Sequence, residues 1–152
     1  MSAPTTLSEK FTDFLHGAIY ASLWSSTVMG DEEQETRPAV DYYMTDGEDK
    51  KLRGTLAYYA RDWFLENFGF LSLAIEKQPA LDWIELGRDW WLTIEGHGAG
   101  YWDRGLEEVG EKLTHECQGY SDIVSFYVDP DDKDYLLVDT YNVTEFNDNL
   151  VI

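Results

Sequence analysis

The feature that most constrains the fold is a stretch rich in aromatic residues and glycine, residues 88–105, which separates two helical patterns. It reads RDWWLTIEGHGAGYWDRG and contains three tryptophans and four glycines. Apolar side chains recur at every second position from Trp90 to Ile94, and a period of two predicts a β-strand with one apolar face. We expect the chain before this strand to be helical, and the chain after it to form one helix and a hairpin.

Apolar residues at helical spacing predict three helices before the strand and one after it. The first should cover residues 7–25, because a capping-box sequence precedes its apolar face. The second is long, over residues 48–76, and Gly69 is the point where we expect it to bend. A short third helix lies within residues 79–87, with a proline at its start and a glycine at its stop. The fourth begins after Gly105.

The C-terminal part of the sequence predicts a β-hairpin. Residues 124–128 alternate between apolar and polar, residues 129–134 are rich in turn formers, and Leu136 and Val138 begin a returning strand. The predicted class is therefore α+β, with two or three helices packed on a small antiparallel sheet of about three strands. We expect a single globular domain over residues 1–152, with a short N-terminal arm at 1–5 and a C-terminal tail at about 142–152.

The charge of the chain is strongly acidic. Thirty acidic residues against eleven basic ones give a formal net charge of −19, which repels DNA, RNA and anionic membranes. We therefore expect no direct nucleic-acid binding and no membrane association. Three explanations for the excess of acidic residues stay open, namely solubility, a high-salt habitat, or a surface that occupies a basic site on another protein.

Other features of the sequence bear on the compartment. The single cysteine, Cys117, excludes a disulfide within the chain and fits a reducing compartment. The sequence contains no apolar run of about 18 residues, so no transmembrane span is expected. The N-terminus lacks the basic and apolar regions of a signal peptide.

Acidic residues gather in three places that could form a surface for a basic partner. The first is the stretch 30–47, which predicts a loop because of its proline and its acids. The second is the start of the helix after Gly105, and the third is the turn of the predicted hairpin. An array of carboxylates can imitate the phosphates of a nucleic acid. The candidate residues for this protein-binding surface are Asp31, Glu32, Glu33, Glu35, Glu107, Glu108, Glu111, Asp129, Asp131, Asp132 and Asp134.

The glycine-rich part of the central stretch offers an alternative site for a ligand. In a small enzyme built there, His97 would act as general acid or base, Asp103 would orient it, and Arg104 would hold an anion. No nucleophile is evident, no metal-ligand spacing is present, and no cofactor is predicted. The candidate ligand loop consists of Gly96, His97, Gly98, Gly100, Tyr101, Trp102, Asp103 and Arg104.

The segment GHGAGYWDRG, preceded by DWWLT and followed by GEKLT, resembles a family of small proteins from bacteriophages and related mobile elements. The resemblance covers roughly residues 86–128, and the N-terminal half shows no such match. It implies a phage-type accessory protein that acts in the cytoplasm of a bacterial host.

Charge and resemblance together favour a binding protein over an enzyme. We expect it to bind and inhibit a basic host protein that itself binds nucleic acid, such as a restriction or CRISPR defence protein, by DNA mimicry. This hypothesis predicts acids in one continuous band. The alternatives are a small ligand-binding or hydrolytic module, in which His97 should line a pocket, and an accessory of virion assembly. The many aromatic residues also leave room for a homodimer interface.

Overall fold

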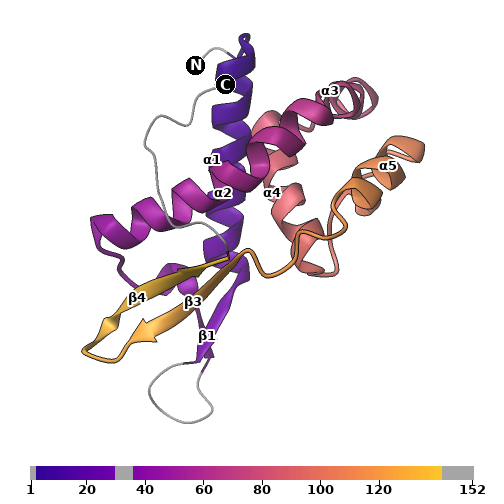
Figure 1. Cartoon of the computed structure of the whole chain (residues 1–152). Coiled ribbons are helices and arrows are strands. Elements are labelled where there is room, and N and C mark those ends of the chain that lie inside the picture. Colours follow the sequence, from indigo (N-terminus) through magenta and orange to yellow (C-terminus); the bar gives the residue numbers. More distant parts are fainter. Residues whose placement is uncertain (1–2, 30–35, 142–152) are drawn as a thin grey trace.

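A computed structural model describes residues 3–29 and 36–141 of the chain. Within them, five α-helices and two antiparallel sheets of two strands each form an α+β fold (Figure 1). The predicted class is confirmed. The predicted number of helices, two or three, is wrong, and two sheets of two strands replace the predicted single sheet of about three strands. The elements are α1 (Leu7–Ser25), β1 (Thr27–Met29), β2 (Thr36–Pro38), the 3-10 turn η1 (Ala39–Asp41), α2 (Asp46–Glu66), α3 (Phe68–Lys77), α4 (Trp83–Glu95), the 3-10 turn η2 (Tyr101–Asp103), α5 (Glu108–Glu116), β3 (Val124–Asp129) and β4 (Asp132–Thr140).

Helix α4 replaces the strand that the alternation of residues 90–94 predicted. It is one continuous helix in which the side chain of Asp82 accepts a hydrogen bond from Glu85 N at the start, and Gly96 ends it with φ at +67°. The prediction failed because it read residues 90–94 alone, where Trp90, Leu92 and Ile94 fit an alternation. Over the whole of α4, the buried residues Leu86, Trp90 and Ile94 recur at helical spacing.

The pairing of α1 with α4 explains why Gly87 does not end a helix as predicted. A Cβ atom added to Gly87 would collide with the backbone carbonyl of Phe14, and one added to Gly17 would collide with that of Ile84. The two helices therefore touch backbone to backbone at these glycines. This close contact places α4 in the middle of the helical core.

The long helix predicted over residues 48–76 is two helices, α2 and α3. The break falls at Asn67, which is 3% exposed and has φ −106° and ψ 10°. Its side-chain amide donates to the carbonyl oxygen of Trp63 at 2.9 Å, and the same oxygen also accepts from Asn67 N at 3.0 Å. Gly69, the expected point of bending, lies inside α3.

Aromatic rings fill the core between these helices. The Trp63 ring stacks on Tyr101 with 6.0 Å between centroids and 8° between planes, and it also packs against Phe14 and Trp90. The indole N–H of Trp63 donates to the carbonyl oxygen of Glu116 at 2.9 Å. These contacts connect α2 to α1, to α4 and to the end of α5.

The predicted C-terminal hairpin is confirmed, and its strands are longer than expected. Strands β3 and β4 pair from Val124 with Thr140 to Asp129 with Asp132, so the predicted turn over residues 129–134 is largely strand. Strand β2 lies within the predicted loop at 30–47, and it pairs with β1, which precedes that loop, to form a second small antiparallel sheet. Among the described helices, none has the length and apolar character needed to cross a membrane.

Candidate partner-binding surface

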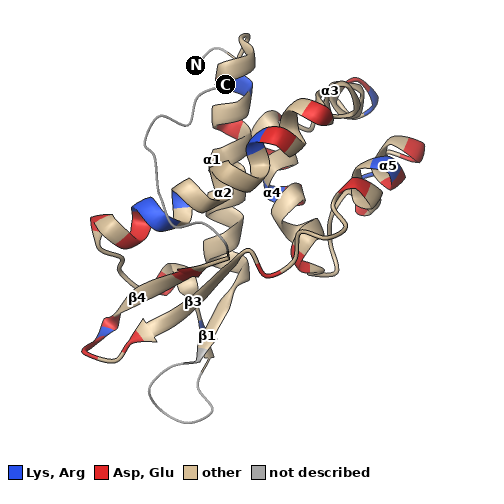
Figure 2. Cartoon of the chain, in the orientation of Figure 1, with Lys and Arg blue, Asp and Glu red and all other residues tan. Residues whose placement is uncertain are grey.

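The acids of the hairpin lie together at its tip. Asp131, Asp132 and Asp134 are exposed and Asp129 is partly buried, and Figure 2 shows them at the end of the hairpin that points away from the helices. One oxygen of Asp129 accepts from Asp131 N at 2.8 Å, and one of Asp132 accepts from Asp134 N at 3.2 Å. These bonds fix the shape of the turn and hold the carboxylates close to one another.

The acids of α5 form a separate area. Glu107, Glu108 and Glu111 are exposed, and the Glu107 carboxylate lies 3.6 Å from the ammonium group of Lys77. Helix α5 and the hairpin tip stand at opposite ends of the molecule in Figure 2. The candidate acids that are described therefore lie in two areas and do not form the one continuous band that DNA mimicry predicts. The remaining candidates, Asp31, Glu32, Glu33 and Glu35, lie outside the described residues.

Three tyrosines accompany the acids of the hairpin. Tyr127 of β3 pairs across the strands with Leu137 of β4, so both side chains lie on the same face of the sheet. Tyr135 is two residues before Leu137 and shares that face. Tyr43 makes a parallel bridge with Tyr135, and their ring centroids are 5.7 Å apart. We call Tyr43, Tyr127, Tyr135 and Leu137 the tyrosine face.

The opposite face of the hairpin is internal. Leu136 is 1% exposed and belongs to a small core with Val28 and Ala39, against which Phe126 and Val128 pack. The hairpin is thereby fixed to β1 and η1 with one face inward. The tyrosine face points outward, with Tyr43 68% and Tyr127 48% exposed.

The outer edge of β4 is also occupied, so the tyrosine face is held rigidly. Tyr43 N donates to Asp134 O and Leu136 N donates to Tyr43 O, both at 2.8 Å. The next free amide along this edge, Val138 N, donates to a carboxylate oxygen of Glu48 at 2.7 Å. Glu48 also pairs with Lys51 at 3.0 Å. The first turn of α2 therefore completes the edge of the sheet.

Two residues of the candidate ligand loop serve the interior of the protein. Tyr101 is fully buried, and its hydroxyl donates to the carbonyl oxygen of Leu86 at 2.7 Å. Arg104 donates to both carboxylate oxygens of Asp89, at 2.9 and 2.8 Å, and Asp89 is fully buried. This hydrogen bonding raises the pKa of Arg104 above its ordinary value. The guanidinium group thus anchors the loop to α4 and is engaged by a carboxylate.

The other members of the loop do not assemble a catalytic group. Gly96, His97, Gly98 and Asp103 are exposed, and in the described part of the chain His97 shares no hydrogen bond with Asp103. Trp102 is 46% exposed, and its ring covers Gly100, where a Cβ atom would collide with it. A cavity of about 210 Å³ beside this ring is lined by Thr93, Ile94, Trp102, Thr114, Cys117, Gln118, Gly119 and Ser121.

The thiol next to that cavity is not an activated nucleophile. Cys117 is 4% exposed, and burial raises the pKa of its thiol well above the ordinary range. A thiol with a raised pKa carries little reactive thiolate at neutral pH. His97 does not line this cavity.

Glu95, the last residue of α4, carries the most unusual carboxyl group near the loop. Its Oε1 atom is buried and has no hydrogen-bond partner. Burial first, and then the charge of Asp122, raise the pKa of Glu95 from 4.5 to about 7, against a hydrogen bond from the Asp122 backbone that lowers it. Its position at the negative end of a helix is also unfavourable for an anion. The stability of the folded protein should therefore depend on pH.

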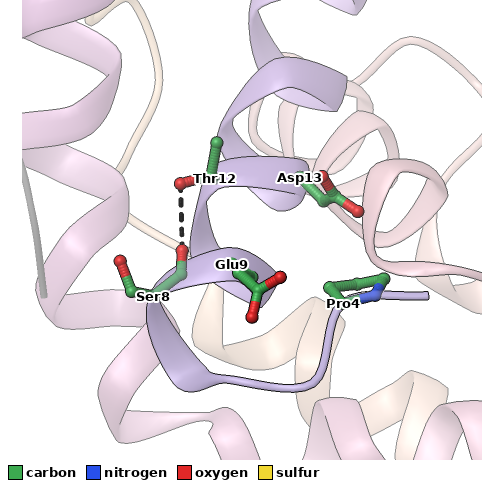
Figure 3. Close-up of a pocket in the computed structure, with 5 residues that line it drawn as sticks. All are labelled: Pro4, Ser8, Glu9, Thr12 and Asp13. Carbon is green, nitrogen blue, oxygen red and sulfur yellow. Dashed lines mark hydrogen bonds between the residues drawn. The ribbon is translucent and has the colours of Figure 1, made fainter. Parts of the chain in front are cut away.

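Two other hollows involve α1. A shallow cavity of about 220 Å³ at the first turns of α1 is lined by Pro4, Ser8, Glu9, Thr12 and Asp13 (Figure 3). Its polar groups cap the helix, since Glu9 accepts from Thr6 N at 3.2 Å and Thr12 donates to Ser8 O at 2.9 Å. A larger groove of about 560 Å³ lies between α1 and α2. Among the described residues, no group of three or more metal-ligating side chains could hold a metal ion.

Comparison with known proteins assigns no family to the chain. No protein-family model matches it, and no solved structure matches it. The geometry of the hairpin end is therefore the evidence for a functional site. The sequence pointed to the acids of that end, whereas the tyrosine face was missed. The sequence does contain a signal for the tyrosine face, because Tyr127 and Tyr135 occupy positions of the alternating strands that otherwise hold polar residues.

Proposed function

We propose that the protein binds a basic, nucleic-acid-binding protein through the end of its hairpin and thereby keeps nucleic acid away from that partner. The working carboxylates are those of Asp129, Asp131, Asp132 and Asp134, which we call the acidic tip. The observation that carries the proposal is the position of the acidic tip beside exposed tyrosine rings on a rigid sheet. Acidic groups alone would serve solubility equally well.

The two kinds of side chain have different tasks in such an interface. The net charge of −19 accelerates the approach of a basic partner and makes binding dependent on salt. Tyrosine rings bury a large area at little cost in side-chain entropy, and tyrosines are enriched among the residues that dominate interface energies. Tyr43 and Tyr127 supply that area next to the acidic tip.

The resemblance to phage proteins supports a bacterial host as the source of the partner. A defence protein that grips DNA has a basic groove of the required kind. Four carboxylates at one turn can replace only a few phosphates of the backbone. We therefore propose local competition for part of such a groove, with the α5 acids as a second, separate area.

The test uses two charge-matched triple variants of the full chain. In one, Asp131, Asp132 and Asp134 are each changed to Asn, which keeps the side-chain oxygen that Asp134 N requires. In the other, Glu107, Glu108 and Glu111 of α5 are each changed to Gln. Both remove three negative charges, so a difference between them reports position and not total charge.

The unaltered protein and both variants are used as bait in nuclease-treated bacterial lysate at low salt. We expect the unaltered protein and the α5 variant to capture a nucleic-acid-binding protein, which roughly 0.5 M salt and added duplex DNA each release. The hairpin variant should lose at least about tenfold in affinity for it. Unchanged binding by the hairpin variant, or a captured protein that DNA does not release, would overturn the proposal.

A further inference from the structure

We infer that the tyrosine face receives arginine side chains of the partner, so that this surface selects guanidinium over ammonium groups. The inference rests on the proposed function, because it specifies the chemistry of the basic partner. It differs from the proposal in naming the residues that discriminate. The acidic tip attracts any cation, whereas flat aromatic rings distinguish one kind of cation from another.

Two rings of the tyrosine face pack against one another. The backbone of Tyr43 is fixed to β4 by hydrogen bonds to Asp134 O and from Leu136 N, each at 2.8 Å. The centroid of its ring lies 5.7 Å from that of Tyr135. Rings that are already packed together lose less freedom when a ligand stacks on them, so more of the contact energy appears as affinity.

The tyrosine face extends across both strands of the hairpin. Leu137 lies between Tyr135 and the ring of Tyr127, with which it is in register across the hairpin. Apolar surface therefore continues from Tyr43 across both strands. The methylene stem of an arginine side chain can lie along such surface while its charged end reaches a carboxylate. Asp139, exposed and two residues from Leu137, stands on the same face.

The chemistry of the cation decides how well it binds to the tyrosine face. A guanidinium group is planar and weakly hydrated, so it stacks on aromatic rings and pairs with a carboxylate through two parallel hydrogen bonds. An ammonium group is compact and strongly hydrated, and it gains less from a ring. The protein itself makes a contact of this kind on the inner side of the hairpin, where the guanidinium carbon of Arg37 lies 4.8 Å from the centre of the Tyr42 ring.

The experiment measures the affinity of the full chain for two fluorescent peptides of equal length and charge, oligoarginine and oligolysine, at low salt. The discriminating variant changes both Tyr43 and Tyr127 to Leu. The matched control changes Tyr20 to Leu, because Tyr20 is 63% exposed and lies on α1. Far-UV circular dichroism confirms that each variant is folded.

We expect the unaltered protein and the Tyr20 control to bind oligoarginine about tenfold more tightly than oligolysine, as two ring contacts would give. The double variant should bind the two peptides equally, with its affinity for oligolysine unchanged. Equal binding by the unaltered protein, or a preference that survives in the double variant, would defeat this inference and leave the proposed function standing. Failure to bind either peptide would defeat both.

Discussion

Replacing Glu95 by Gln should stabilise the protein at pH 8 relative to pH 5. The carboxyl group of Glu95 has a buried oxygen without a hydrogen-bond partner, and its pKa is raised to about 7 by burial and by Asp122. In the unfolded chain the pKa returns to about 4.3. Between these values the folded state holds a proton that the unfolded state releases, so folding stability decreases as the pH rises from about 4 to about 7 and is constant above that.

The magnitude follows from the size of the pKa change. From an ordinary value of 4.5 to about 7, at about 1.4 kcal/mol for each pH unit, the full effect is roughly 3 kcal/mol. Glu95 is only partly buried, and screening by solvent reduces the expected effect to ~1–2 kcal/mol. Glutamine does not titrate. The Gln variant therefore avoids the whole penalty at pH 8, and at pH 5 it avoids only the smaller part that is already present there.

The assay is urea unfolding of both proteins at pH 5 and pH 8, followed by tryptophan fluorescence. The quantity of interest is the change in the effect of the substitution between the two pH values, because the packing difference between Glu and Gln cancels in it. Asp122→Asn should reproduce a smaller part of the effect, since burial is the larger cause. An effect of Glu95→Gln that is the same at both pH values would refute the reasoning.

Two further predictions concern the core. Asp89→Asn should lower the free energy of unfolding in urea by roughly 3–5 kcal/mol, because it leaves the Arg104 guanidinium without its buried counter-charge. The control Asp103→Asn, at an exposed position, should change that free energy by no more than about 0.5 kcal/mol. Equal effects of the two substitutions would contradict the assigned role of the ion pair. Gly87→Ala should lower the free energy of unfolding by roughly 1–3 kcal/mol, because the added methyl group pushes α1 away from α4. The control Gly69→Ala, where a Cβ meets nothing within 4 Å, should be neutral or stabilising, and a harmless Gly87→Ala would disprove the backbone contact.

The sequence predicted those elements whose faces differ in polarity. Helix α1 has one apolar side and a capping box at Thr6, and its bounds were predicted as observed. The hairpin was predicted because β3 and β4 alternate between core and solvent. The second half of α4 was mistaken for a strand because residues 90–94 alone fit an alternation. The break at Asn67 was missed because Phe64, Phe68 and Leu71 continue the apolar stripe across it at helical spacing.

The candidate site was predictable only in part, for a related reason. The acids of the hairpin tip are contiguous in sequence, so a turn was enough to bring them together. Tyr43 and Tyr135 are far apart in the chain and meet only because the segment after η1 bridges to β4. Likewise, Arg104 was a candidate anion ligand from its place in the loop alone, whereas its partner, Asp89, stands 15 residues earlier, on α4.

The most direct test of the central claim is the Kd of the captured partner for the two charge-matched triple variants, measured at one ionic strength. If the acidic tip binds the partner, changing Asp131, Asp132 and Asp134 to Asn raises the Kd at least about tenfold, and changing Glu107, Glu108 and Glu111 to Gln raises it by no more than about twofold. Equal increases for the two variants would mean that net charge alone drives the association, and would contradict a binding site at the hairpin end.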